Sequence, residues 1–202
     1  MSLSLVQSRA LLGLNAAAVT VEVHLANGLP SFTLVGLADV EVKEARERVR
    51  SAILNAGFDF PAGRITINLA PVELAKEGGR YDLPIALALL IASAQLRVTR
   101  DPLPECYGEL GLDGKLRPVR GLLLAAVQAS RAGREIIVPA ADLHEVRLAR
   151  ALGAYGFQDL HAVCKFLTGE IDEGVECPSA PGFGTSESSI IVSLKGQYRS
   201  EE

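Results

Sequence analysis

The sequence lacks the features that mark membrane, secreted and metal-binding proteins. Its longest apolar stretch, residues 83–96, contains Pro84, Ser93 and Gln95, so it falls short of a bilayer span. No basic segment precedes an apolar run at the N-terminus, as a signal peptide requires. The three cysteines and three histidines are scattered, which fits neither a disulfide framework nor a metal cluster. We therefore expect a cytoplasmic globular protein that holds no metal and contacts no membrane.

An excess of charge of one sign is also missing from most of the chain. The net charge of -4 comes from 24 acidic and 20 basic residues, and residues 170–202 contain seven of the acids but only two of the bases. Residues 1–169 are therefore almost neutral. A nearly neutral domain does not attract a polyanion over its whole surface, so any contact with nucleic acid requires a local basic patch.

Sequence motifs of the common enzyme classes are absent as well. Neither Gly-x-Ser-x-Gly, His-Glu-x-x-His nor Cys-x-x-Cys occurs. Gly111 and Gly114 precede Lys115, but a P-loop needs four residues between its glycines and a Ser or Thr after its lysine, whereas Leu116 follows here. Asp113-Gly114 predicts a hairpin turn instead. The chain is therefore not expected to bind ATP or to be an enzyme.

What the sequence does contain is a mixture of strand and helix patterns. Alternating apolar residues predict strands at residues 20–25, 32–35 and 65–69, with further short strands after residue 105. Helices are predicted at residues 39–55, 83–95, 121–132, 142–151 and 159–167. Asp39 is expected to cap the first helix and Asp82 the second. These patterns predict one α+β domain, a mixed sheet with helices packed on it, over residues 1–168.

The composition changes after residue 168. Gly, Pro, Ser and Glu dominate residues 169–202 without a repeat, which is typical of a linker or tail.

The loop at residues 76–82, before the apolar helix, indicates a binding site, because its glycines allow close approach and the start of a helix favours anions. Its sequence is Lys76-Glu-Gly-Gly-Arg-Tyr-Asp-Leu-Pro84. Together with Pro30-Ser-Phe-Thr-Leu-Val-Gly-Leu, Val42-Lys-Glu-Ala-Arg-Glu-Arg-Val-Arg-Ser-Ala, Ile65-Thr-Ile-Asn-Leu-Ala-Pro and the segment 108–133, this loop resembles the N-terminal domain of the ComM-type (ComM/YifB) magnesium-chelatase-like AAA+ proteins of bacteria. The resemblance covers residues 1–169.

The resemblance implies a fold like that of the proteolytic domain of Lon, which uses a Ser-Lys dyad. When the Lon motifs are laid on this sequence, Arg80 occupies the position of the serine and Leu123 that of the lysine. Arginine cannot serve as the nucleophile, and leucine offers no base. The resemblance therefore implies a degenerate dyad and no catalytic residue.

A binding site is the expected replacement for the dyad. The candidate anion- or DNA-binding residues are Lys76, Arg80, Arg117 and Arg120, and the loop that presents them contains Gly78, Gly79 and Asp82. Alternatively, Arg80 pairs with Glu77, Asp82 or Glu109 and only holds the loop in place. Both interpretations stay open at this stage.

The resemblance further implies what a complete relative would do. Members of the family carry an AAA+ ATPase that hexamerises and is associated with DNA branch migration in natural transformation. Ser193-Leu-Lys-Gly-Gln197 is similar to the beginning of that ATPase, so we expect a truncated product whose ATP and Mg²⁺ belong to the missing module. The sequence thus favours a non-catalytic accessory domain that binds DNA weakly or binds a partner. A degenerate hydrolase and a product with no independent activity are the alternatives.

Overall fold

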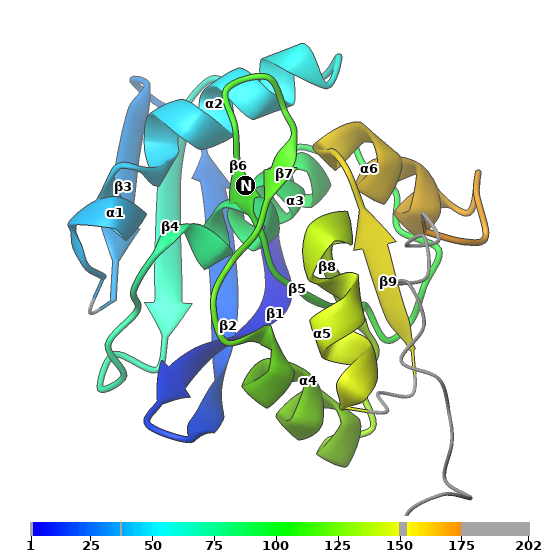
Figure 1. Cartoon of the computed structure of the whole chain (residues 1–202). Coiled ribbons are helices and arrows are strands. Elements are labelled where there is room, and N and C mark those ends of the chain that lie inside the picture. Colours follow the sequence, from blue (N-terminus) through cyan, green and yellow to red (C-terminus); the bar gives the residue numbers. More distant parts are fainter. Residues whose placement is uncertain (1, 37, 150–152, 175–202) are drawn as a thin grey trace, which may run out of the picture.

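A computed structural model describes residues 2–36, 38–149 and 153–174 of the chain. Its main sheet has four strands in the order β1-β2-β4-β3 (Figure 1). These strands are β1 (Ser2–Leu12), β2 (Asn15–Ala26), β3 (Ser31–Val35) and β4 (Arg64–Ala70). The pairs β1-β2 and β2-β4 are antiparallel, whereas β3 runs parallel to β4. The predicted mixed sheet and α+β class are thus confirmed.

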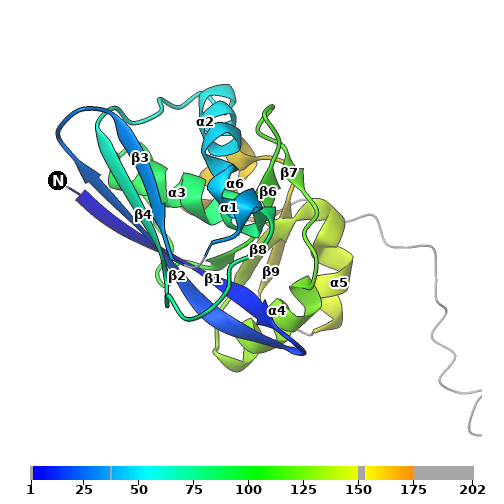
Figure 2. The same cartoon turned by 90° about the vertical axis from the view of Figure 1, so that its left-hand side faces the viewer.

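Two helices cover one face of this sheet (Figure 2). Helix α3 (Asp82–Ala92) packs on β1 and β2, and α2 (Ala45–Asn55) packs on α3. Almost every residue of α3 is buried, because its sequence after Asp82 contains no charged side chain. Alternate residues of β2, such as Val21 and Val23, point into the same core.

The predicted helix over residues 39–55 is divided in the structure. Asp39 caps the short helix α1 (Val40–Lys43), as expected, by accepting a hydrogen bond from the backbone N–H of Val42 at 2.8 Å. Glu44 then separates α1 from α2.

A second, smaller sheet lies beside the first. It contains three parallel strands, in the order β5 (Glu105–Cys106), β8 (Ile136–Pro139) and β9 (Ala154–Phe157). Ile137 of β8 packs in the core under α3, whereas Ile136 and Val138 pack in a separate cluster with α4 (Leu122–Arg131) and α5 (Leu143–Leu148). Both faces of β8 are therefore buried, as its continuous apolar sequence requires.

The remaining elements are short. The expected hairpin at Asp113-Gly114 exists, but its strands β6 (Glu109–Leu110) and β7 (Leu116–Arg117) are only two residues long. Short 3₁₀ helices occupy Gly79–Tyr81 and Ala140–Asp142.

Helix α6 (Leu160–Thr168) is followed by Gly169 in the left-handed conformation. Most of the expected linker, and the expected start of an ATPase domain, lie at residues 175–202, outside the described residues. The domain boundary at residue 168 thus stays a prediction.

A buried ionic network joins the two sheets. Arg9 of β1 donates two hydrogen bonds to Glu105 of β5, at 2.8 Å from Nε and 2.7 Å from Nη2. The hydroxyl of Tyr107 donates to the same carboxylate at 2.7 Å, and Arg134 lies 3.6 Å from it. Glu105 is 2% exposed, so its buried oxygen atoms depend on these partners for their hydrogen bonds.

Candidate anion-binding site

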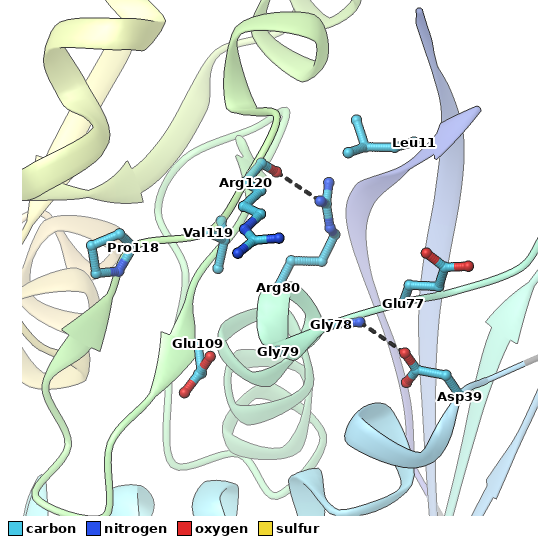
Figure 3. Close-up of a pocket in the computed structure, with 10 residues that line it drawn as sticks. All are labelled: Leu11, Asp39, Glu77, Gly78, Gly79, Arg80, Glu109, Pro118, Val119 and Arg120. Atoms are coloured by element: carbon cyan, nitrogen blue, oxygen red, sulfur yellow. Dashed lines mark hydrogen bonds between the residues drawn. The ribbon is translucent and has the colours of Figure 1, made fainter. Parts of the chain in front are cut away.

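The predicted loop lines a recess of about 510 Å³, which we call the Arg80 recess (Figure 3). One wall is the loop at residues 77–80, which leads into α3, and another is the segment 118–120, which leads into α4. Leu11 at the end of β1, Asp39 before α1 and Glu109 of β6 complete the lining. Five segments of the chain therefore meet at this recess.

Arg80 is the central cation of the recess and is only 7% exposed. Its Nη2 donates a hydrogen bond to the carbonyl oxygen of Arg120 at 2.7 Å. Its Nη1 is buried and has no hydrogen-bond partner among the described residues. A buried donor without a partner costs about 1–3 kcal/mol, and more when it belongs to a charged group. An oxygen atom of an anionic ligand would satisfy this donor.

Carboxylates make the recess mixed in charge. Asp39 accepts from the N–H of Val42 and, at 3.1 Å, from the N–H of Gly78, so it fixes the loop as well as capping α1. Glu109 lies 3.4 Å from Arg117. Glu77 also lines the recess, so three carboxylates stand beside two guanidinium groups, and the recess does not suit a dense array of negative charges.

The two glycines of the loop are required by its geometry. Gly78 has φ 75° and ψ 171°, a conformation that other residues rarely adopt. A Cβ atom on Gly79 would lie 2.6 Å from Cγ of Glu109, which is too close. These positions therefore let the loop pass directly beside β6 and turn into α3.

The structure separates the four predicted cations. Arg80 and Arg120 line the recess, but Lys76 and Arg117 do not. The side chain of Lys76 is fully buried and donates to the carbonyl oxygen of Pro71. Arg117 is exposed and pairs with Glu109. Two guanidinium groups rather than four cations are thus available at the recess.

Asp82 has a different role from the one that its position at a helix start suggests. It is the first residue of α3, Tyr81 occupies the N-cap position, and no capping hydrogen bond from Asp82 is present. Its Oδ2 lies 2.6 Å from Nε of Arg48, and the N–H of Leu110 donates to the same oxygen at 3.2 Å. Asp82 thus pairs with Arg48 and not with Arg80, and it holds α2, α3 and β6 together behind the recess.

Burial raises the pKa of Asp82 from its ordinary 3.8 to about 6, although the hydrogen bonds and the charge of Arg48 oppose this increase. The sequence contains no signal of this pairing, because Arg48 and Asp82 are 34 positions apart. The alternative in which Arg80 pairs with Glu77, Asp82 or Glu109 has no ion pair to support it among the described residues, and Arg80 instead donates to the backbone of Arg120.

The two positions equated with the Lon dyad lie on adjoining segments. Arg80 contacts Arg120, and Leu123 follows three residues later, in the first turn of α4. The backbone N–H of Leu123 donates to Glu145 at 3.1 Å. The described residues that line the recess include no serine, threonine, cysteine, histidine or lysine.

No helix among the described residues is long and apolar enough to span a membrane. No group of three or more His, Cys, Asp or Glu side chains in the same part of the chain is arranged to hold a metal ion.

Comparison with known proteins places the chain in a family. Residues 21–142 match the family described as subunit ChlI of Mg-chelatase, and the chain belongs to this family. Within it, the chain is 55% identical over 170 residues to the protein YifB of Salmonella typhimurium and 49% identical to the competence protein ComM of Haemophilus influenzae. The resemblance to ComM/YifB proteins is thereby confirmed, whereas the similarity to Lon stays a prediction.

These matches cover 84% of this chain but about a third of each relative, 34% of YifB and 33% of ComM. A more distant relative, the protein Rv2897c of Mycobacterium tuberculosis, is 38% identical over the same length. The chain therefore corresponds to one part of these longer proteins.

Proposed function

We propose that this chain is a non-catalytic accessory domain of a ComM-like protein, and that the Arg80 recess binds an anionic group, in the first place a phosphate of DNA. The observation that carries the proposal is the buried Nη1 of Arg80, which has no hydrogen-bond partner among the described residues. A guanidinium group with a free donor is suited to an oxyanion, and Arg120 supplies a second one at the rim.

The relatives supply the biological direction of the proposal. The Haemophilus influenzae relative is named a competence protein, and we carry that association with DNA uptake to this chain. In this proposal ATP and Mg²⁺ bind to an ATPase module outside these residues, and copies of that module assemble into the hexamer. An acidic group on a protein partner is the alternative ligand of the same chemistry.

The lining of the recess favours binding over catalysis. Hydrolysis by a Ser-Lys dyad needs a hydroxyl beside an amine, and the described lining residues provide neither group. This composition supports the accessory function over the alternative of a degenerate hydrolase. A chain with no independent activity would bind neither DNA nor a partner, and the following experiment tests the first of these two interactions.

The test is fluorescence anisotropy with single-stranded and forked DNA at several salt concentrations. Because two arginines rather than four cations reach the recess, we expect log affinity to fall with log salt with a slope of about -1 to -2. Arg120→Ala should reduce the magnitude of that slope by about one, without changing the preference among sequences.

Arg131→Ala is the matched control, because Arg131 is an exposed arginine of α4 that neither lines the recess nor forms an ion pair or hydrogen bond with a residue of its lining among the described residues. It should leave the slope unchanged. Equal effects of the two substitutions would assign DNA binding to diffuse surface charge, and an unchanged affinity in Arg120→Ala would argue against the recess as the DNA site.

A further inference from the structure

A second hollow lies on another part of the molecule and shares no lining residue with the Arg80 recess. It has a volume of about 340 Å³ and lies between α2, the start of β3 and the segment 59–63. Its walls include Phe32, Arg46, Arg50, Leu54, Phe60 and Ile65. We call it the β3 groove, and Figure 2 views the molecule from the side on which β3 lies.

Two arginines of α2 are held at this groove by aromatic rings. The guanidinium carbon of Arg46 lies 5.8 Å from the ring centroid of Phe32, and that of Arg50 lies 5.5 Å from the centroid of Phe60. Such contacts restrict the long side chains and keep their donors available at the edges of the guanidinium planes. The two cations are four residues apart and therefore on the same side of α2.

The strand beside the groove has an open edge. In the described residues β3 is the last strand of its sheet, and no strand pairs with its outer edge (Figure 1). The N–H of Ser31 donates to Gly63, on the β4 side, at 3.1 Å. Because successive residues of a strand direct their amide groups to opposite edges, Phe32 and Leu34 present theirs outward.

The composition of this edge is unusual for an unpaired strand. Residues 31–35, Ser-Phe-Thr-Leu-Val, include no charged residue and no proline, which are the devices that commonly protect an edge from pairing. The edge therefore offers backbone donors and acceptors to an added strand.

We propose that the β3 groove binds an acidic, extended peptide segment of a partner protein. The segment pairs with the open edge of β3 and directs the carboxylates of alternate residues to Arg46 and Arg50 in the groove. Alternate residues of an extended chain are about 7 Å apart, close to the rise of about 6 Å over four helical residues. A peptide with acids at alternate positions thus matches the two cations.

The local charges favour such a peptide over a nucleic acid. Asp59 lines the groove, and Arg46 lies 3.6 Å from Glu47, so the net charge here is small. A polyanion gains little from a surface of this kind, whereas isolated carboxylates can pair with each guanidinium in turn. A nucleic acid also makes no use of the open strand edge.

The test uses the whole chain and a fluorescein-labelled peptide of eight residues in which Glu and Val alternate. We expect saturable binding by anisotropy, and little binding of the matching peptide of Lys and Val. Charge reversal in Arg46→Glu/Arg50→Glu should weaken binding at least about tenfold. The matched control is Arg131→Glu, which changes an exposed arginine of α4 away from the groove and should leave binding unchanged.

Hydrogen exchange gives an independent measurement of the strand pairing. The amides of Phe32 and Leu34 should exchange more slowly when the Glu-Val peptide is bound, while that of Thr33, directed at β4, should change little. Three results would overturn the proposal: no binding of the peptide, preferential binding of a thymidine 20-mer that depends on the two arginines, or self-association of the chain that Arg50→Glu abolishes. None of these results depends on the Arg80 recess.

Discussion

The roles of two buried charged residues, Asp82 and Arg80, depend on the hydrogen-bond partners that the fold places beside them. Asp82 is the clearest example, because it is fully buried and yet paired with Arg48 at 2.6 Å. Its pairing stabilises the junction of α2, α3 and β6, while its burial opposes ionisation. Arg80 differs from Asp82, because it is almost as buried but its Nη1 has no hydrogen-bond partner among the described residues. The first residue serves the fold, and we assign the second to a ligand.

The raised pKa of Asp82 predicts a specific dependence of stability on pH. Between about pH 4 and pH 6 the unfolded chain loses this proton while the folded chain keeps it, so the contribution of Asp82 to the free energy of unfolding decreases with pH. A shift of about two pKa units corresponds to about 3 kcal/mol. Above pH 6 the contribution is constant.

Urea unfolding of the chain and of Asp82→Asn from pH 4 to pH 7 measures this effect as the difference between the two free energies. We expect the difference to fall by up to this amount across the window. The same comparison with Asp113→Asn, an exposed carboxylate whose pKa is lowered by its contacts with Lys115, should show no such decrease. A difference that rises with pH would show that the pairing with Arg48 outweighs burial.

At the scale of elements, the local patterns predicted the fold well and the site only in part. The apolar run after Asp82 identified α3, and Asp39 was correctly predicted as a helix cap, because both features depend on neighbours in the sequence. The pairing of Arg48 with Asp82 joins residues 34 positions apart, and that of Arg9 with Glu105 joins residues 96 apart. No periodicity in the sequence reports such contacts.

The placement of the cations illustrates the same limit. Lys76 belongs to the glycine-containing loop by sequence, but the loop turns its side chain inward to Pro71. A lysine that is fully buried has no distinguishing signal in a single sequence. The position of Arg80 at the start of α3 could be predicted from the sequence, whereas its bond to the backbone of Arg120 required the structure.

The connection between the two sheets leads to a stability prediction. Glu105→Gln should destabilise the protein by about 3–5 kcal/mol, because it leaves Arg9 and Arg134 without their shared buried carboxylate. Glu109→Gln makes the same chemical change in a partly exposed pair and should cost less than about 1 kcal/mol. Denaturant unfolding of both variants checks the comparison, and equal losses would mean that the network does not hold the sheets together.

The whole molecule combines an α+β core with two separate candidate binding surfaces, and we expect it to lack the chemistry of a motor. Purified chain should show no heat of ATP binding by titration calorimetry, since the hairpin at residues 111–114 does not have the spacing of a P-loop. Lys115 at that hairpin is exposed and pairs with Asp113 at 3.3 Å. Stoichiometric binding of ATP would refute this expectation and require a nucleotide site of another kind.

The parallel pairing of β3 and β4 has a consequence for the order in which the molecule can assemble. The two strands are joined through α1 and α2, so every residue that lines the β3 groove lies between residues 30 and 65. Contacts within so short a stretch close small loops and carry a low entropic cost. The Arg80 recess also needs residues 118–120. During synthesis from the N-terminus, all residues of the β3 groove have therefore been added well before the last residues of the Arg80 recess.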